Sequence, residues 1–580
     1  ELAALAGVSA SVLTGLEAQG VLERVAAPRD ASYPALACDR PEALRLSPPQ
    51  NAAAEALCEA ARTEAYSTTL LKGVTGSGKT EVYLEAVAET LRQGRQALVL
   101  LPEIALSASF LERVEARFGA RPGEWHSGVT QAARRRLWHA AAEGTVQLVV
   151  GARSALFLPF RDLGLIVVDE EHDGSYKQED GVLYHARDMA VLRATFEGAQ
   201  VVLASATPSL ETWVNAETGK YRRLDLPDRF GPSELPRMDA IDLRLDPPET
   251  GRWISPELES AVGKALAAGE QALLFINRRG YAPLTICRAC GQQVGCEQCD
   301  ARMVEHRFRR RLVCHQCGAT RPVPEVCPHC KAEGKLTSLG PGVERLAEEA
   351  AGLWPEARLA ILSSDLAPTH SALRAQIATI ADGGADLVIG TQIVSKGHNF
   401  PLLTLVGVID ADLGLQGGDL RAAEKTFQLI RQVAGRAGRH ERPGRALVQT
   451  HQPDHPALRA ILSGDDEAFW RAEAEMRQRA GMPPYSRLAG IIVSGRNEPK
   501  VWEVARSLAR GQAPLTDAGA TLFGPAPAPI ARIRGRHRMR LLVRAPRAAR
   551  LQHALRAWIA AVPCPSSVRI AVDIDPQSFM

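Results

Sequence analysis

The stretch Gly73–Thr80, "GVTGSGKT", constrains the fold most, because it fits the phosphate-loop pattern G-x-x-x-x-G-K-[ST] at every defined position. It follows the apolar run "TTLLK", which predicts a strand, a loop and then a helix. Glycines let backbone N–H groups converge on a phosphate, and the following helix points its positive end at the anion. We predict that Lys79 binds the β and γ phosphates and that the Thr80 hydroxyl binds Mg²⁺. The predicted nucleotide-binding residues of this loop are Gly73, Val74, Thr75, Gly76, Ser77, Gly78, Lys79 and Thr80. For the loop alone, a glycine-rich turn without a ligand is the alternative.

The chain from Leu46 alternates buried-strand runs with helical segments. The runs include "ALVLLP", "VQLVV", "LIVVDEEH" and "QVVLASAT". Such alternation predicts parallel sheets with crossover helices. The pattern loosens after about Leu226, resumes with "ALLFINRRG", and continues past a cysteine-rich block with "LVIGTQ". We therefore expect an α/β protein with two such units, the second of which is split by an insert.

A chain of 580 residues is too long for one hydrophobic core, so about three to five domains are expected. The predicted parts are a partial winged helix at 1–28, a linker at 29–45, lobe 1 at 46–226, lobe 2 at 227–285 and 332–464, a cysteine-rich insert at 286–331, and a C-terminal α+β domain at 465–580. For the first segment, any helical hairpin is an equal alternative. The chain starts at Glu1 rather than methionine, so we expect that an upstream piece is missing.

The composition, with 46% hydrophobic and 23% charged residues, is that of an ordinary soluble globular protein. No apolar run reaches the ~18 to 20 residues of a membrane span, and the N-terminus lacks a secretory pattern. We expect a cytoplasmic protein without a membrane partner.

Two further motifs extend the nucleotide site. A buried strand ends in "DEEH", where Asp169 is placed to hold Mg²⁺ and Glu170 to orient and deprotonate a water. A solvated turn or a helix N-cap is the alternative for this acidic strand end. "QVAGRAGR" carries Arg436 and Arg439, which we predict to reach the γ-phosphate as arginine fingers. A basic surface helix is the alternative there.

Together these stretches resemble helicase superfamily 2. "SATPSLE" (205–211) looks like the coupling motif of that superfamily, and "GTQIVSKGHNF" (390–400) looks like its DNA-contacting motif. "LSPPQ", with Gln50, resembles the element that reads the adenine edge. The resemblance implies two RecA-like lobes with ATP between them, whose closure moves one lobe along a DNA strand.

Eight of the 11 cysteines lie within the 44 residues from Cys287 to Cys330, spaced CxxC-x5-CxxC-x14-CxxC-x9-CxxC. Four CxxC pairs provide enough thiolates for two tetrahedral zinc sites. Disulfides, a redox CxxC and iron–sulfur clusters are weaker alternatives. We favour a nested arrangement over sequential pairing, in which a hairpin joins the two inner pairs and the two outer pairs close around it. Zinc 1 would take Cys287, Cys290, Cys327 and Cys330, and zinc 2 would take Cys296, Cys299, Cys314 and Cys317.

The cysteine spacing, the segment "LLFINRRGYAPLTICRACG" before it and "DEEHDGSYKQEDGVLYHARD" (169–188) make the resemblance more specific. The chain is similar to the PriA family of bacterial replication-restart helicases (primosomal protein N′) from about residue 46 onward. The resemblance implies an ATP-dependent 3′-5′ DNA helicase that recognises stalled or abandoned replication forks and initiates primosome assembly. The implied partners are forked and single-stranded DNA, single-strand-binding protein, and primosome proteins that load the replicative helicase.

The alternatives are a scaffold of the same fold that binds forks without unwinding, and a related translocase or RNA helicase. Two positions depart from the family pattern, because "LSSDL" keeps only Asp365 and Val343 stands in the usual "GTE". These departures put coupling in question. The phosphate loop and "DEEH" are complete, so we predict an active motor.

Contacts to DNA are expected at three places. The loop after "DEEH" offers Tyr176 and Tyr184 for base stacking, beside Lys177, His185 and Arg187. The hairpin within the cysteine block is basic. The arginines between Arg532 and Arg550 alternate as on one face of a strand and would follow a phosphate backbone. A solubilising face is the alternative for these arginines.

Overall fold

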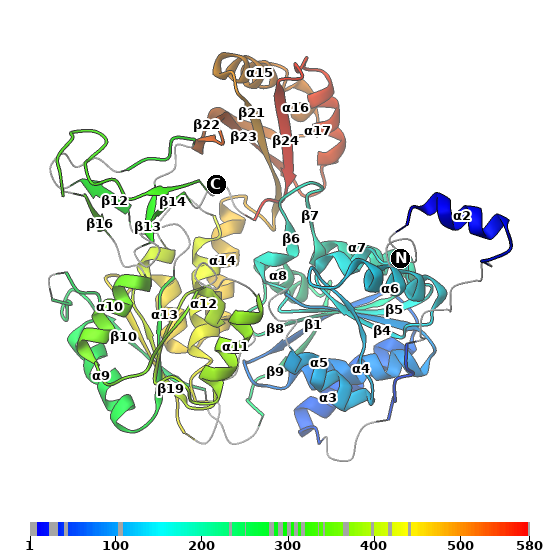
Figure 1. The fold of residues 1–580 in the computed structure, drawn as a ribbon, viewed down its shortest axis with the longest axis horizontal. Coiled ribbons are helices and arrows are strands. Elements are labelled where there is room, and N and C mark those ends of the chain that lie inside the picture. The colour runs from blue at the N-terminus through cyan, green and yellow to red at the C-terminus, as the bar shows by residue number, and fades with distance from the viewer. Residues whose placement is uncertain are drawn as a thin grey trace.

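The computed structural model shows two α/β lobes side by side, with a cysteine-rich module and a C-terminal domain above them (Figure 1). The structure describes residues 8–22, 33–39, 45–102, 108–230, 235–249, 251–277, 284–287, 294–298, 303–306, 311–314, 319–334, 336–339, 343–363, 370–395, 400–415, 420–438 and 442–577. Below, lobe 1 denotes the elements around the seven-stranded sheet and lobe 2 those around the six-stranded sheet.

Lobe 1 is built on a parallel sheet with the strand order β3-β4-β2-β5-β8-β1-β9. Its strands are β1 (Ser67–Gly73), β2 (Gln96–Leu100), β3 (Gly123–Trp125), β4 (Leu148–Gly151), β5 (Leu163–Asp169), β8 (Gln200–Ser205) and β9 (Arg222–Leu226). Helices α3 (Pro48–Arg62), α4 (Lys79–Arg92) and α5 (Ala108–Phe118) cover one face, and α6 (Gln131–Glu143) and α7 (Ala186–Glu197) cover the other. Because both faces are buried, the central strands are apolar almost throughout.

Lobe 2 has a parallel sheet with the order β10-β20-β19-β11-β18-β17. Its strands are β10 (Arg237–Asp242), β11 (Gln271–Phe275), β17 (Leu359–Leu362), β18 (Leu387–Gly390), β19 (Leu403–Val408) and β20 (Arg445–Thr450). Helices α9 (Pro256–Ala267) and α10 (Val343–Leu353) pack on one face. The other face packs against α11 (His370–Ala381), α12 (Ala422–Ala434), α13 (Pro456–Ser463) and α14 (Asp466–Arg479).

The two lobes share part of one hydrophobic core. Helix α8 (Leu210–Glu217) follows the lobe 1 strand β8, yet its Leu210, Trp213 and Val214 belong to the core cluster of lobe 2. Phe469 and Trp470 of α14 lie in the same cluster, although we expected α14 to belong to the C-terminal domain. Apolar packing of α8 against lobe 2 therefore holds the two lobes together.

The cysteine-rich module interrupts lobe 2 between β11 and α10 and forms an antiparallel sheet, β15-β14-β13-β12-β16. The strands are β12 (Leu284–Cys287), β13 (Val304–His306), β14 (Arg311–Val313), β15 (Thr320–Pro322) and β16 (Leu336–Leu339). Among the described residues of the module, the apolar cluster has five buried members: Val294, Cys296, Met303, Leu312 and Cys314. A core of this size supplies little folding energy, which is typical of modules stabilised by a metal.

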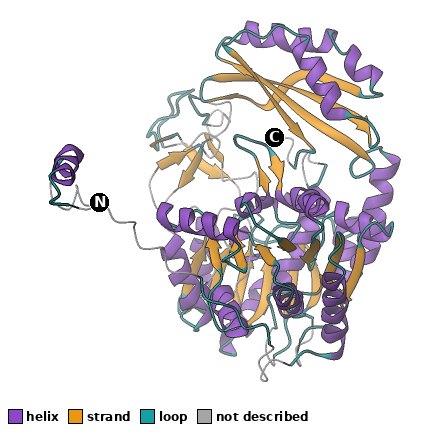
Figure 2. Cartoon of the chain, turned by 90° about the vertical axis from the view of Figure 1, so that its right-hand side faces the viewer, coloured by secondary structure: helices purple, strands orange, loops and turns teal. Residues whose placement is uncertain are grey.

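The C-terminal domain is an antiparallel sheet, β22-β23-β21-β24, covered by helices on one face (Figure 2). Its strands are β21 (Ser486–Gly495), β22 (Thr521–Ile533), β23 (Arg536–Pro546) and β24 (Val568–Ile574). The covering helices are α15 (Glu498–Arg510), α16 (Ala513–Asp517) and α17 (Leu551–Ala560). Ile533, near the turn between β22 and β23, packs against the apolar cluster of the cysteine-rich module. The C-terminal domain thus contacts the insert as well as the lobes.

The predicted fold class is confirmed for the two α/β lobes, the cysteine-rich insert and the C-terminal α+β domain. Residues 8–22 hold one helix, α2 (Ala10–Ala18), which lies apart from the rest in Figure 2, so the partial winged helix stays a prediction. The predicted linker packs on lobe 1, where the Leu36 N–H donates to Gln147 Oε1 at 2.8 Å. The exact domain boundaries also remain predictions. Across the described ranges, every helix is too short or too polar to cross a bilayer.

Candidate functional site

The phosphate loop connects β1 to α4, as the sequence predicts. Gly76 and Gly78 have φ values of +87° and +78°, a region that favours glycine. A Cβ on Gly78 would also lie 2.3 Å from the Gln50 Nε2, so a side chain there would displace the Gln50 amide. Lys79 is buried, and its Nζ donates to the Gly73 carbonyl at 2.7 Å. The loop therefore has the shape and the charge of an anion-binding site at a helix N-terminus.

Gln50 lies against this loop and is buried in lobe 1. The Ser47 N–H donates to Gln50 Oε1 at 2.8 Å, and Gln50 Nε2 donates to the Ser77 carbonyl at 2.8 Å. The first bond belongs to a capping box at the start of α3. Gln50 thus connects the start of α3 to the phosphate loop, and its contact with adenine stays a prediction.

The acidic motif begins at the end of β5, directly opposite the start of α4. The Tyr83 hydroxyl donates to Asp169 Oδ2 at 3.0 Å and also interacts with Thr80, three residues before it on the same helix face. Burial and the neighbouring Glu170 charge raise the pKa of Asp169 to about 6, while Lys79 opposes this rise. Tyr83 therefore links the two predicted Mg²⁺ ligands. Sequence reasoning missed Tyr83, although its i, i+3 position after Thr80 was a usable signal.

The hydroxyl of Thr80 and the carboxylate of Asp169 are oxygen ligands of the kind that Mg²⁺ prefers. The phosphate loop beside them suits the phosphates of a nucleotide. The residues present therefore fit Mg²⁺ and ATP.

Residues after Asp169 reach toward lobe 2. Glu170 has a φ of +48°, and its N–H donates to Asp169 Oδ1 at 2.9 Å. The His172 Nδ1 lies 2.7 Å from Ser205 Oγ, in the stretch that resembles a coupling motif. Gln432 of α12 places its Nε2 2.5 Å from His172 Nε2 and 3.5 Å from Glu170 Oε2. The acidic motif, the coupling motif and lobe 2 therefore meet at one point.

Arg436 lies in the turn that follows α12 and is buried in the same region. Burial lowers the pKa of Arg436 to about 10, and the charge of Glu170 opposes this shift. A Cβ on the preceding Gly435 would lie 3.0 Å from Thr75 Oγ1 of the phosphate loop. The structure therefore brings Lys79, Asp169, Glu170 and Arg436 together where the two lobes meet. Arg439 lies outside the described residues.

A buried ionic cluster also joins the two lobes, beside the residues of the predicted nucleotide site. Glu211 of α8 pairs with Arg421, which also lies 3.4 Å from Glu424. Glu424 accepts from the Leu210 N–H at 2.9 Å and from Arg477 at 2.8 Å. Because removing one partner would leave a buried charge unpaired, this cluster favours the present arrangement of the lobes.

The loop after the acidic motif is used differently from our prediction. Tyr176 is buried, and its hydroxyl donates to the carbonyls of Asp169 at 2.6 Å and of Leu100 at 2.9 Å. The expectation that Tyr176 stacks on exposed bases is therefore wrong. Lys177 is also buried and pairs with Asp573 of β24 at 2.6 Å. These adjacent residues hold the loop to β5 and to the C-terminal domain.

The other two polar residues of the loop are also interior. Arg187 pairs with Glu171 at 3.2 Å, inside lobe 1. His185 is buried, which lowers its pKa to about 3, so the ring is neutral near pH 7. Neither side chain faces solvent, where a nucleic acid would approach.

Tyr184 remains accessible and has an aromatic neighbour. Its ring meets Phe157 edge to face, with centroids 5.0 Å apart and an interplanar angle of 85°. Phe157 is 59% exposed and lies in the short helix η2 (Arg153–Phe157). Together the two rings offer an exposed aromatic surface on lobe 1. Sequence reasoning did not select Phe157, because it lies far from the loop in the chain.

The C-terminal arginines alternate on β23 as predicted. Arg538, Arg540 and Arg544 alternate with the buried Met539, Leu541 and Val543, so they lie on the sheet face without helices. The Arg544 guanidinium lies 5.6 Å from the ring centroid of Phe523, which is 44% exposed. This open face therefore combines positive charge with an exposed aromatic ring.

Three protein-family models match the chain. They are the primosomal protein N C-terminal domain at residues 478–577, the DEAD/DEAH box helicase at 47–215, and the PriA DNA helicase Cys-rich region domain at 296–322. Replication restart protein PriA of Rickettsia felis is 44% identical over 516 residues, covering 89% of this chain and 79% of that protein. The chain belongs to the PriA family. The PriA of Bacillus subtilis is 40% identical over 504 residues, covering 87% of this chain and 62% of that protein. Among solved structures, RecG bound to a three-way DNA junction has a TM-score of 0.46 at 15% identity, covering 75% of this chain and 47% of that chain.

The match to the PriA Cys-rich region spans both predicted inner cysteine pairs. Cys296 and Cys314 are buried in the same apolar cluster, at the two ends of the predicted hairpin. Cys327 is buried and Cys330 is exposed. Thiolates in CxxC pairs fit zinc. Cys290, Cys299 and Cys317 lie outside the described residues and only the backbone of Cys287 is described, so the zinc pairing stays a prediction.

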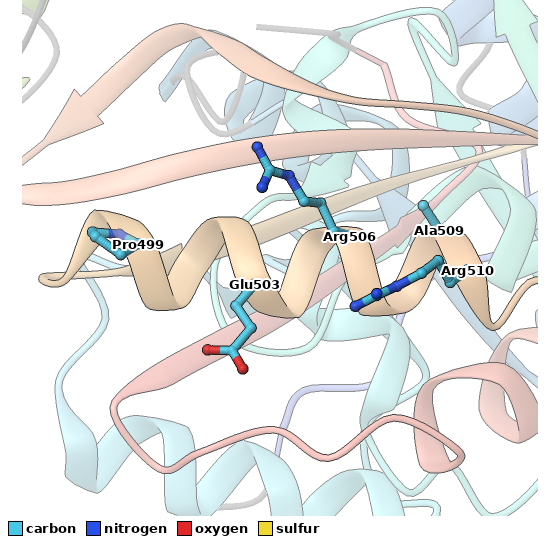
Figure 3. Close-up of a pocket in the computed structure, with 5 residues that line it drawn as sticks. All are labelled: Pro499, Glu503, Arg506, Ala509 and Arg510. Atoms are coloured by element: carbon cyan, nitrogen blue, oxygen red, sulfur yellow. The ribbon is translucent and has the colours of Figure 1, made fainter.

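A groove on the C-terminal domain lies apart from these sites (Figure 3). Pro499, Glu503, Arg506, Ala509 and Arg510 line it, and all five belong to α15. This helix lies at the top of the molecule in Figure 1, whereas the phosphate loop lies between the lobes below. The groove therefore adds nothing to the nucleotide site of this PriA-family chain.

Proposed function

We propose that the chain is an ATP-dependent 3′-5′ DNA helicase that recognises stalled or abandoned replication forks and initiates primosome assembly. One observation carries this proposal. In a PriA-family chain, the phosphate loop of lobe 1 touches the turn of lobe 2 that holds Arg436. A nucleotide bound there would contact both lobes, so its hydrolysis would change how the lobes fit together.

The proposed roles follow from the geometry of this site. Lys79 binds the β and γ phosphates, and Thr80 and Asp169 hold Mg²⁺, which neutralises phosphate charge when bound. Glu170 orients and deprotonates the attacking water. Arg436 and Arg439 stabilise the charge that develops on the γ-phosphate, and Gln50 contacts the adenine.

The coupling path would run through Gln432. Its side chain touches both His172 and Glu170, so a change at the γ-phosphate reaches α12 directly. Val343 begins α10, on the sheet face of lobe 2 opposite α12, whereas Asp365 lies outside the described residues. We therefore propose that the motor is active despite these departures.

We further propose two DNA-contacting surfaces. Phe157 and Tyr184 would stack on bases of a single strand, and the open face of β23 would bind phosphates through its arginines. The cysteine-rich module, with two zinc ions in nested sites, would lie beside the C-terminal domain, because Ile533 packs against its apolar cluster. Single-strand-binding protein and the primosome proteins that load the replicative helicase are the proposed partners, and the domain boundaries given above belong to this proposal.

The test compares wild type with Lys79→Ala, using ATP hydrolysis with and without forked DNA and the unwinding of the same fork. Lys500→Ala, an exposed lysine of α15, is the matched control. We expect Lys79→Ala to lose hydrolysis and unwinding by about 100-fold or more while keeping fork binding, because preorganised phosphate contacts supply most of the catalysis.

Wild-type protein that binds forks without hydrolysing ATP would instead favour the scaffold. Equal activity on duplex RNA would favour the RNA helicase.

A further inference from the structure

Arg229 lies in the segment that leaves lobe 1 after β9 and runs along the phosphate loop. The Val74 N–H donates to the Leu226 carbonyl at 3.1 Å, and the Phe230 N–H donates to the Gly76 carbonyl at 3.0 Å. The Arg229 Cγ lies 3.7 Å from the position of a Cβ on Gly76. The backbone and side chain of this segment therefore follow the phosphate loop closely.

The Arg229 guanidinium crosses to lobe 2 and binds the turn after α12. It donates to the carbonyls of Gly435 at 2.9 Å, Ala437 at 3.2 Å and Gly438 at 2.7 Å. Gly435 is the C-cap residue of α12, where carbonyls lack intrahelical donors and the helix dipole is negative, and Ala437 and Gly438 lie in the turn that follows. Arg229 is thus a C-terminal cap supplied by the other lobe.

The environment of Arg229 is unusual for a buried cation. The residue is only 8% exposed, and burial lowers its pKa. Among the described residues, its hydrogen-bond acceptors are backbone carbonyls rather than carboxylates. Burying an arginine is costly, and the hydrogen bonds to the three carbonyls offset part of that cost. This arrangement indicates that Arg229 serves to hold the turn.

The three carbonyls belong to the residues directly before and after Arg436 in the chain, namely Gly435, Ala437 and Gly438. On the lobe 2 side, the turn is already fixed, because the Gly438 N–H donates to Leu403 at 2.9 Å and Gly438 has a φ of +67°. On the lobe 1 side, Arg229 donates three hydrogen bonds to this turn, beside the contact between Gly435 and Thr75 of the phosphate loop. Movement of Arg229 would therefore change the distance between Arg436 and a bound triphosphate.

We propose that Arg229 is a positioning residue that fixes the turn Gly435–Gly438 against the phosphate loop and so sets the place of Arg436 at the γ-phosphate. The inference rests on the proposed function, since it assigns a task within the same ATP site. It predicts that Arg229 affects the rate of hydrolysis and leaves the affinity for nucleotide nearly unchanged, because Arg229 acts through Arg436.

The experiment measures DNA-stimulated ATP hydrolysis by Arg229→Ala, Arg436→Ala and the double variant. A misplacement of about 1 Å costs about 100-fold in rate, so Arg229→Ala should lower kcat by about 30- to 100-fold with less than about a threefold change in KM. The loss should vanish in the Arg436→Ala background. Arg229→Lys should restore part of the rate, since an ammonium reaches some of the carbonyls without the planar fork.

Two readouts separate positioning from a general structural role. The affinity for a fluorescent ADP should be unchanged in Arg229→Ala, and hydrogen exchange should rise only in peptides that contain the turn Gly435–Gly438. Arg237→Ala, with a side chain that is 80% exposed, is the matched control and should behave as wild type.

Unchanged kcat in Arg229→Ala, additive losses in the double variant, or a loss of ADP binding that lysine does not restore would each overturn the proposal. Absence of ATP hydrolysis in the wild type would instead contradict the proposed function itself. The two failures are therefore distinguishable.

Discussion

Tyr83 gives the sharpest test of how the metal ligands are held. The side chain is fully buried on α4, and its hydroxyl donates to Asp169 Oδ2 at 3.0 Å while also touching Thr80. Tyr83→Phe removes this one oxygen and keeps the ring, so packing is preserved. The substitution therefore isolates a single hydrogen bond to a predicted Mg²⁺ ligand.

The size of the effect follows from the charge on the acceptor. A hydrogen bond to a charged group contributes about 1.5–3 kcal/mol, which corresponds to about 10- to 100-fold in an equilibrium. Loss of a group that supports a metal ligand has an effect of the same size on metal affinity. Without the Tyr83 donor the ionised Asp169 is less stable, so its pKa should rise further above about 6. Because only the carboxylate binds Mg²⁺, affinity should fall most as the pH approaches that value from above.

The assay measures ATP hydrolysis against Mg²⁺ concentration at pH 7 and pH 8 with forked DNA present. We expect the half-saturating Mg²⁺ concentration of Tyr83→Phe to rise about tenfold or more at pH 7 and to recover partly at pH 8. Tyr221→Phe, another buried tyrosine of lobe 1, serves as the control. If both variants need the same Mg²⁺ concentration as wild type, Tyr83 does not support the metal site and the reasoning is refuted.

Three other predictions concern the interface between lobes and the DNA surface. Glu211→Gln removes one of the two carboxylates that pair with the buried Arg421, so we expect a loss of up to about 3–5 kcal/mol in the stability of the joined lobes, seen as a lower Tm than for the exposed control Glu217→Gln. Burial opposes the lowered pKa of Glu467, but its bonds from Arg223, Lys72 and Trp213 bring that pKa to about 2. The resulting stabilisation is complete above the unfolded pKa of 4.5 and falls progressively as the pH drops from there toward 2, so it should stay constant from pH 5 to 8 and disappear in Glu467→Gln at pH 7. A contribution in wild type that changes between pH 5 and 8 would contradict this prediction. Phe157→Ala should weaken single-stranded DNA binding by about tenfold, at roughly 1–3 kcal/mol per stacked base, whereas Phe196→Ala, also exposed on lobe 1, should not; equal effects would exclude specific stacking.

Local patterns predicted the elements that hold the nucleotide site. The phosphate loop and "DEEH" each lie at the end of a buried strand, and parallel strands bring such ends to one edge of a sheet. The alternation of arginines on β23 was equally readable, because a strand has a period of two. These features depend on residues that are near one another in the chain.

Contacts between distant residues could not be predicted in the same way. Tyr176 looks like an exposed aromatic residue in sequence, yet its hydroxyl satisfies two carbonyls inside lobe 1. Lys177 pairs with Asp573, and Arg229 donates to carbonyls of a turn of the other lobe, each from a remote part of the chain. No local period signals such pairs, so only the folded structure shows that these polar side chains are internal.

The central claim is that one ATP lies between Lys79 of lobe 1 and Arg436 of lobe 2. The most direct measurement is a structure of the chain with a non-hydrolysable ATP analogue, Mg²⁺ and a forked DNA. The account predicts one analogue whose γ-phosphate contacts both Lys79 and Arg436, with Thr80 and Asp169 on the metal side. An analogue bound to the phosphate loop while Arg436 stays out of reach of every phosphate would contradict it.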